Sequence, residues 1–270
     1  MNDLEAFAKL TQALAPWSSQ LVFIGGWAHR LHRFDSRANK LAHQPVFTRD
    51  TDLAFATETS IDGDIKSALD KHGFKEVLMG ELTPAVAHYT LGDENHGFYA
   101  EFLTPLSGSG RKRNGKPDAT ISTAGITAQK IRYLDVLLVT PWVIKVGPQN
   151  EVPLPEPVDV LVAHPLCFMV QKFLIQKHRD AAKRAQDLLY IYDTIELFGP
   201  LLSEFNTEWA NVVKPALGTL SNDVLKASEE TFSSVTDLIR DAARIPQDRK
   251  LPPEQIQQTC QYAFDQILRT

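Results

Sequence analysis

The stretch from Leu21 to Thr57 constrains the fold of this chain more than any other. It contains the apolar run Leu21-Val22-Phe23-Ile24, the glycine pair Gly25-Gly26 and, further along, Thr48-Arg49-Asp50-Thr51-Asp52-Leu53. A short apolar run that ends in glycines predicts a buried strand and a tight turn, and residues 27–34 then predict a helix. The run from Asp50 to Thr57 predicts a second strand, which carries two carboxylates.

These two acids are suited to metal binding. Side chains alternate along a strand, so Asp50 and Asp52 emerge on the same face. Paired carboxylates hold Mg²⁺, and a glycine turn at a helix N-terminus lets backbone N–H groups approach a phosphate. Arg49 either pairs with a carboxylate or binds phosphate. The simpler alternative is a pair of acids that faces solvent, as acids usually do.

A third acid lies in a later strand. Glu101 interrupts the otherwise apolar run Phe98–Leu106. A lone buried carboxylate costs several kcal/mol unless it is paired or binds a cation. We therefore expect Glu101 to share a metal with Asp50 and Asp52; the alternative is an ion pair with Arg49 or Arg132.

The remaining pattern predicts an α+β fold with a mixed sheet, flanking helices and a helical C-terminal part. Polar composition predicts loops at residues 35–47 and 107–120. Periodicity predicts helices at 3–15, 61–72 and 126–138, and strands at 74–79, 85–91, 98–106, 141–146 and 158–162. The proline-spaced run before residue 158 suggests a boundary. We expect a catalytic domain at 1–157 and a mainly helical domain at 158–270.

Composition narrows the functional class. The net charge of −5 argues against a broadly basic nucleic-acid coat, but basic residues cluster at 111–116 and 172–184, which allows RNA contact through local patches. Cys167 and Cys260 indicate buried thiols, not a disulfide framework or a zinc site. No apolar run is long enough to span a bilayer and no signal pattern opens the chain, so we expect a cytoplasmic protein without membrane contact.

The helical part contains one further charged pattern. Lys172 lies off the apolar stripe of a predicted helix that begins at Pro165, and Asp180 is expected to cap the next helix. Lys183 and Asp187 stand four residues apart on that second helix. Taken alone, they read equally well as an ordinary surface ion pair.

The ordered set of glycine turn, D-x-D strand and later acid resembles the DNA polymerase β nucleotidyltransferase superfamily. Gly25-Gly26-Trp27-Ala28 and Thr48-x-Asp50-x-Asp52 are similar to bacterial nucleotidyltransferase-like proteins related to AbiEii and MenT toxins. The later Lys172, followed by Arg179, Lys183 and Asp187, is similar to the lysine and R-x-x-x-K-x-x-x-D pattern of those families. The resemblance covers about residues 20 to 198.

The resemblance implies an enzyme that moves NMP from an NTP, such as ATP, to an acceptor hydroxyl with two Mg²⁺ ions. Asp50, Asp52 and Glu101 would be the catalytic metal ligands. Gly25, Gly26, Arg49, Lys172, Lys183 and Asp187 would bind the nucleotide, with Asp187 near the nucleotide or orienting Lys172. The turn departs from the family by lacking a serine, and the interval from Gly26 to Asp50 is longer than usual.

The acceptor stays open. The toxin-like relatives imply a tRNA 3′ end or another RNA, with an antitoxin protein as a partner. The same glycine turn and acid pair also look like aminoglycoside nucleotidyltransferases, which favours a small-molecule acceptor in an acidic protein. A non-catalytic nucleotide-binding protein that kept the fold is the third alternative.

Overall fold

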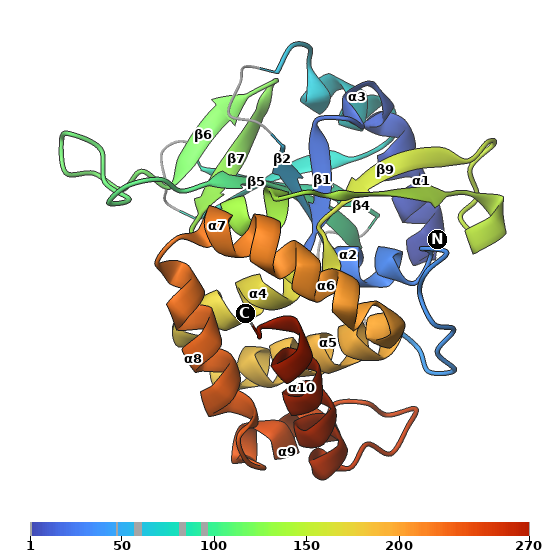
Figure 1. Ribbon diagram of the computed structural model, residues 1–270. Helices are drawn as coiled ribbons and strands as arrows, with labels where there is room; N and C mark the ends of the chain where they lie inside the picture. Colours follow the sequence, from blue (N-terminus) through green and yellow to red (C-terminus); the bar gives the residue numbers. More distant parts are fainter. Residues whose placement is uncertain (1, 47, 57–60, 81–84, 93–96, 270) are drawn as a thin grey trace. The chain divides into compact units, whose positions relative to one another are not determined.

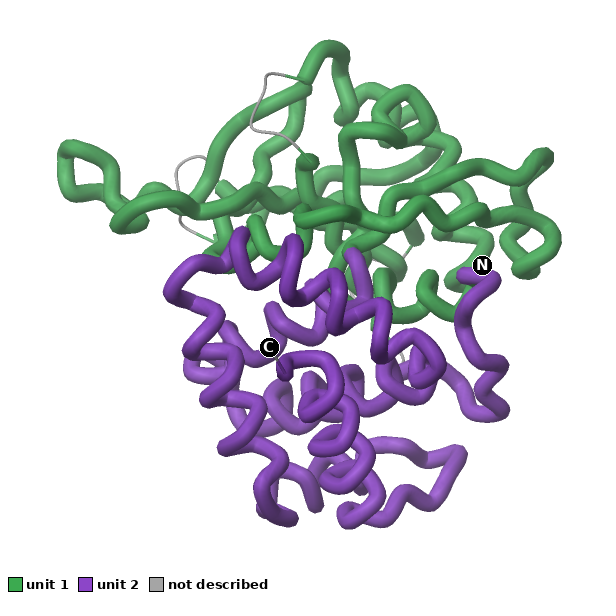
Figure 2. Tube along the Cα trace, viewed as in Figure 1, with its two compact units in different colours: residues 1–34, 47–163 green, residues 35–46, 164–270 purple. Residues whose placement is uncertain are grey.

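A computed structural model describes residues 2–46, 48–56, 61–80, 85–92 and 97–269. Thr57, at the end of the predicted second strand, and residues 93–96 of a predicted turn lie outside these ranges. The chain forms two compact units (Figure 2): unit 1 comprises residues 1–34 and 47–163, and unit 2 comprises 35–46 and 164–270.

Unit 1 is built on one mixed sheet, which has nine strands among the described residues (Figure 1). The strand order is β3-β4-β5-β2-β1-β9-β8, and β7 pairs with both β5 and β6. The bounds are β1 Leu21–Ile24, β2 Asp50–Phe55, β3 Lys75–Met79, β4 Val86–Leu91, β5 Phe98–Pro105, β6 Thr120–Thr123, β7 Ile126–Ile131, β8 Trp142–Val146 and β9 Val158–Val162; the helices are α1 Asp3–Ala13, α2 Gly25–His32 and α3 Ile65–Lys71.

Aromatic side chains fix the two N-terminal helices onto the sheet. Phe7 of α1 stacks on Trp27 of α2 with ring centroids 4.6 Å apart, and the Trp27 edge meets Phe98 of β5. Trp27 and Phe7 are fully buried, and large buried aromatic rings dominate core energetics. The turn at Gly25 is therefore held on a packed base.

The expected helix at 126–138 is wrong. Residues Ile126–Ile131 form strand β7, parallel to β5 and antiparallel to β6, and only Asp135–Leu138 is helical, as a short 3₁₀ turn. Burial alternates at the start of β7, where Ile126 and Ala128 are buried. Ile131, Leu134 and Leu138 fit helical spacing by chance, while the β-branched residues of the segment favour a strand.

Unit 2 is helical, and its aromatic core joins three helices: Phe173, Phe232 and Phe264 pack with centroids 5.0 to 6.2 Å apart. The helices are α4 Pro165–Ile175, α5 Ala181–Phe198, α6 Leu202–Glu208, α7 Lys214–Leu217, α8 Leu220–Phe232, α9 Asp237–Arg244 and α10 Pro253–Ile267. Together with the sheet of unit 1, these helices confirm the expected α+β fold.

The compact units differ from the expected domain division in two places. Unit 1 extends to Ala163, because β9 pairs in parallel with β1. Residues 35–46 group with unit 2, where Asn39 N donates to Leu197 O at 2.8 Å and Asn39 Nδ2 to Glu196 O. Segments far apart in sequence thus complete each unit.

Cys167 and Cys260 are both free and buried in unit 2, as expected for packing thiols. Burial raises the pKa of each thiol, to about 12 for Cys167. Neither thiol has the thiolate character that metal binding or nucleophilic attack needs. Among the described helices, none combines the length and apolar character that a bilayer crossing requires.

Candidate active site

The sheet register brings the three predicted acids together. Strand β2 lies between β1 and β5, so Asp52 is opposite Ile24 on one side and Glu101 on the other. Asp50 is opposite Tyr99 of β5. Because directly paired residues project from the same face of a sheet, the three carboxylates and the Tyr99 ring share one face.

The alternation expected for β2 is confirmed. Asp50 and Asp52 are half-buried, whereas Thr51 and Leu53 are buried on the opposite face. The hydroxyl of Thr48 donates to Asp50 Oδ1. The two acids are thus partly accessible on one face of β2, and the hydrogen bond from Thr48 restricts the rotamer of Asp50.

Gly25 touches the second acid. Strand β1 ends at Ile24 and α2 begins at Gly25, whose φ of +63° favours glycine. A Cβ at this position would lie 2.2 Å from Asp52 Oδ2, so the Asp52 carboxylate would have to move to accept any other residue. The N-cap residue of α2 is Ile24, whose side chain offers no hydrogen-bond acceptor to the first N–H groups of the helix.

Tyr99 reports how closely the negative charges converge. Burial raises its pKa, and the charges of Asp50, Glu101 and Asp52 raise it further, to about 12. The positive charge of Arg49 lowers the pKa of the same hydroxyl. The phenol therefore stays protonated at neutral pH, and one small region holds an excess of negative charge together with Arg49.

His88 is a member of this cluster that the sequence did not reveal. It lies opposite Glu101 in the antiparallel pair of β4 and β5, and its Nε2 is 3.0 Å from Glu101 Oε1. Its ring stacks on Tyr99 with centroids 5.1 Å apart. Glu101 is therefore partly buried and paired with a histidine, not the lone buried carboxylate expected. Arg132, an alternative partner, donates to Gly108 O. Only the strand register could have identified His88.

In unit 2, Lys172 and Asp187 form a buried ion pair. Lys172 Nζ is 2.7 Å from Asp187 Oδ1, and both side chains are at most 6% exposed. Arg179 Nε lies 3.6 Å from the other carboxylate oxygen, and the ammonium sits 5.0 Å from the Phe168 ring centroid. Asp187 is therefore the counter-charge of Lys172 in the interior of unit 2.

The alternative of an ordinary surface ion pair between Lys183 and Asp187 is wrong. Asp187 is buried and pairs with Lys172 and Arg179, whereas Lys183 is exposed on the first turn of α5. The backbone N–H of Lys183 donates to Asp180 Oδ1, which confirms Asp180 as the N-cap. The face of α4 that carries Lys172 is buried as well, because every residue of this helix is buried.

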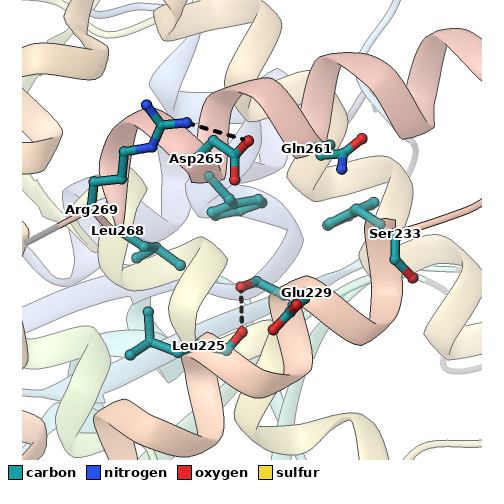
Figure 3. A pocket seen from close by; sticks show the side chains of 10 residues that line it. Leu225, Glu229, Ser233, Gln261, Asp265, Leu268 and Arg269 are labelled. Atoms are coloured by element: carbon teal, nitrogen blue, oxygen red, sulfur yellow. Dashed lines mark hydrogen bonds and ion pairs between the residues drawn. The ribbon is translucent and has the colours of Figure 1, made fainter.

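Unit 2 also has an open pocket of about 330 Å³ between α8 and α10 (Figure 3). Its lining is mixed: Phe232 and Leu268 lie beside Glu229 and the ion pair of Asp265 and Arg269, 3.7 Å apart. None of the residues predicted from sequence lines it. The pocket therefore gives no support to a catalytic role at this place.

A family model described as nucleotidyltransferase matches residues 2–214, which is most of the chain and includes every site residue predicted from the sequence. The chain belongs to this nucleotidyltransferase family. It is accordingly an enzyme that uses an NTP and transfers its nucleotidyl group. No curated protein matches the sequence.

Nucleotidyltransferases typically use a divalent cation, and the residues of unit 1 fit one. Asp52 and Glu101 are cross-strand neighbours and Asp50 is two residues away on the same face. Hard divalent cations prefer such oxygen ligands. Because Gly25 has no Cβ, the space beside the Asp52 carboxylate stays free.

Proposed function

We propose that this nucleotidyltransferase is Mg²⁺-dependent and transfers NMP to the 3′-hydroxyl of an RNA, with Asp50, Asp52 and Glu101 as metal ligands. The observation that supports this proposal most strongly is the close approach of Gly25 to Asp52, because Asp52 is in turn paired with Glu101 across β2 and β5. This arrangement places a helix N-terminus suited to phosphate beside carboxylates suited to the accompanying cations.

Each residue has a defined task in this proposal. Two bound Mg²⁺ ions would supply Lewis-acid activation of the phosphate and the acceptor hydroxyl. The N–H groups of Gly25 and Gly26 bind the phosphates. Thr48 orients Asp50, and Arg49 balances the charge of the triphosphate. In unit 2, Lys172 pairs with Asp187 and Lys183 is exposed; the resemblance implies that both lysines bind phosphate.

A basic segment of unit 1 supports RNA as the acceptor. Residues 111–116 carry Arg111, Lys112, Arg113 and Lys116, all exposed, and extend away from the sheet between β5 and β6 (Figure 1). The backbone N–H of Lys112 donates to Lys116 O at 2.8 Å, so the segment is an ordered turn. Clustered exposed cations of this kind bind phosphate backbones despite a negative net charge.

The resemblance to AbiEii- and MenT-related toxins supports a tRNA 3′ end as the acceptor and an antitoxin as a protein partner. A small-molecule acceptor, as in aminoglycoside nucleotidyltransferases, is favoured by the net charge of −5. The two differ in their response to salt. RNA binding weakens steeply as salt rises, whereas binding of a small acceptor responds little.

The test is incubation of the purified chain with each labelled NTP and Mg²⁺, in one arm with total bacterial RNA and in a second arm with an aminoglycoside. The Asp50→Ala/Asp52→Ala double variant is treated in the same way. We expect label on RNA with the wild type only, and loss of label when EDTA replaces Mg²⁺. Equal labelling by both proteins contradicts the assignment of the acids. Labelling of an aminoglycoside but not of RNA transfers the assignment to the small-molecule acceptor, and binding of NTP without transfer to either contradicts catalysis.

A further inference from the structure

A second group of potential metal ligands lies entirely within unit 2, and neither the sequence pattern nor the proposed reaction uses it. His43, Asp193 and Glu196 each present one ligand atom, and these atoms lie within 4.8 Å of one another. Asp193 and Glu196 stand three apart on α5 and so share a helix face. His43 comes from the segment 35–46, which interrupts unit 1 in sequence but groups with unit 2.

Asp193 shows that the group lacks positive charge. The residue is fully buried, and Arg249 donates to its Oδ1. Its other oxygen, Oδ2, is buried and has no hydrogen-bond partner among the described residues. A buried ionised oxygen without a partner is unfavourable by several kcal/mol in general, so a cation beside Oδ2 stabilises the site.

The neighbouring groups orient the other two ligands. Tyr192 donates to Glu196 Oε1 at 2.7 Å, and Gln255 donates to the Tyr192 hydroxyl. Glu196 Oε2 then lies 3.6 Å from His43 Nε2. His43 Nδ1 is 3.1 Å from Gln44 O; a proton on Nδ1 is donated to that carbonyl, and Nε2 then presents its lone pair to the carboxylates. Such outer hydrogen bonds are typical of metal-binding histidines.

From this geometry we propose that His43, Asp193 and Glu196 bind one Zn²⁺ ion that fastens segment 35–46 to α5. One imidazole nitrogen and two carboxylate oxygens are a Zn²⁺ ligand set, with a water as the fourth ligand. Imidazole favours Zn²⁺ over Mg²⁺ and Ca²⁺, so this site is chemically distinct from the all-carboxylate group of unit 1. Two acids and Arg249 leave one net negative charge for the ion to offset.

The structural role follows from the other bonds of the segment. Besides the two Asn39 bonds, Gln44 N donates to Asp248 Oδ2 at 2.7 Å, so the segment joins α5 to the stretch before α10. A metal clip between His43 and α5 closes a long loop of chain, which restricts the unfolded state more than the folded one.

The experiment is isothermal titration of the EDTA-treated full chain with ZnCl₂ alone, without nucleotide, followed by anomalous diffraction at the zinc edge. We expect one ion per chain and a rise in Tm on Zn²⁺ addition. His43→Ala and Glu196→Gln should each lower the affinity for Zn²⁺ at least about tenfold. Glu196→Gln keeps the acceptor for Tyr192, so it tests the ligand without disturbing the helix.

Two controls separate this site from others. His178→Ala removes an exposed histidine of unit 2 and should leave the affinity unchanged. Asp50→Ala/Asp52→Ala should also keep the ion, because the proposed catalytic ligands are different residues. The proposal is overturned if the wild type binds no Zn²⁺, or if folded His43→Ala and Glu196→Gln variants bind it with unchanged affinity. His43 would then contact Glu196 without a metal ion.

Discussion

Unit 1 and unit 2 each hold a group of charged side chains that the sequence suggested, and they are built in opposite ways. In unit 1, Asp50, Asp52 and Glu101 lie on one face of the sheet, and all three are partly buried. In unit 2, Lys172 and Asp187 are buried between α4 and α5 and neutralise each other at 2.7 Å. The first group concentrates charge of one sign, and the second balances it.

The difference separates groups that receive a ligand from groups that maintain a side-chain position. Like charges on neighbouring rigid strands contribute little to the stability of the fold, and their mutual repulsion is relieved when a cation binds. A buried pair is required by the fold, because either partner alone is an uncompensated charge. Mutations should therefore separate activity from stability in unit 1 and couple them in unit 2.

The largest expected effect is on activity. Asp52→Asn should lower nucleotidyl transfer about a thousandfold, equivalent to about 4 kcal/mol of transition-state stabilisation, because a metal ligand is lost. Its free energy of unfolding should stay the same or rise, since repulsion from Glu101 is relieved. Single-turnover assays and urea unfolding measure the two quantities.

The matched control is Asp159→Asn, which removes an exposed acid of β9 in the same sheet and should leave both quantities unchanged. Full activity in Asp52→Asn, or an equal loss in Asp159→Asn, contradicts the separation of activity from stability in unit 1.

The next effect is on stability. Asp187→Asn should lower the free energy of unfolding by about 3 kcal/mol, because Lys172 is left buried without its counter-charge. The double variant Lys172→Met/Asp187→Asn should recover most of that loss, although its activity should stay low. Urea denaturation measures both. Additive losses in the double variant would mean that the pair is not coupled.

A smaller effect is expected at the turn. Gly25→Ala combines an unfavourable φ of +63° with the 2.2 Å clash against Asp52, and should lower stability by about 2 kcal/mol and reduce activity at least tenfold. Gly73→Ala has a φ of +88° but its nearest atom is at 3.5 Å, so it should show only about 1 kcal/mol and keep activity. Thermal unfolding distinguishes the strain from the clash, and equal activity in the two variants would rule out a role for the close approach.

The smallest effect concerns His88. His88→Gln should lower the Mg²⁺ concentration for half-maximal activity about threefold, or about 0.7 kcal/mol, because the imidazole competes for Glu101. His72→Gln, at the C-terminus of α3, is the control and should not alter it. A Mg²⁺ titration decides; a higher Mg²⁺ requirement in His88→Gln would instead make His88 a group that supports Glu101.

The sequence predicted the local parts of the site well. The buried strand before Gly25, the alternation at Asp50 and Asp52, the strand that carries Glu101 and the cap at Asp180 are all present. Each depends on a few neighbouring residues, whose periodicity and turn chemistry are local properties. At residues 126–138 the local spacing predicts a helix, but residues Ile126–Ile131 form a strand that pairs with β5.

The residue chemistry and the short-range spacing were thus determined by the sequence alone. Only the tertiary structure decided that β5 lies beside β2 in a register that places Glu101 opposite Asp52, and that His88 is next in the same row. It likewise decided that Asp187 turns to Lys172 and that His43 meets α5. These contacts join residues that are distant in sequence, and their register depends on the packing of the whole unit, which no local spacing encodes.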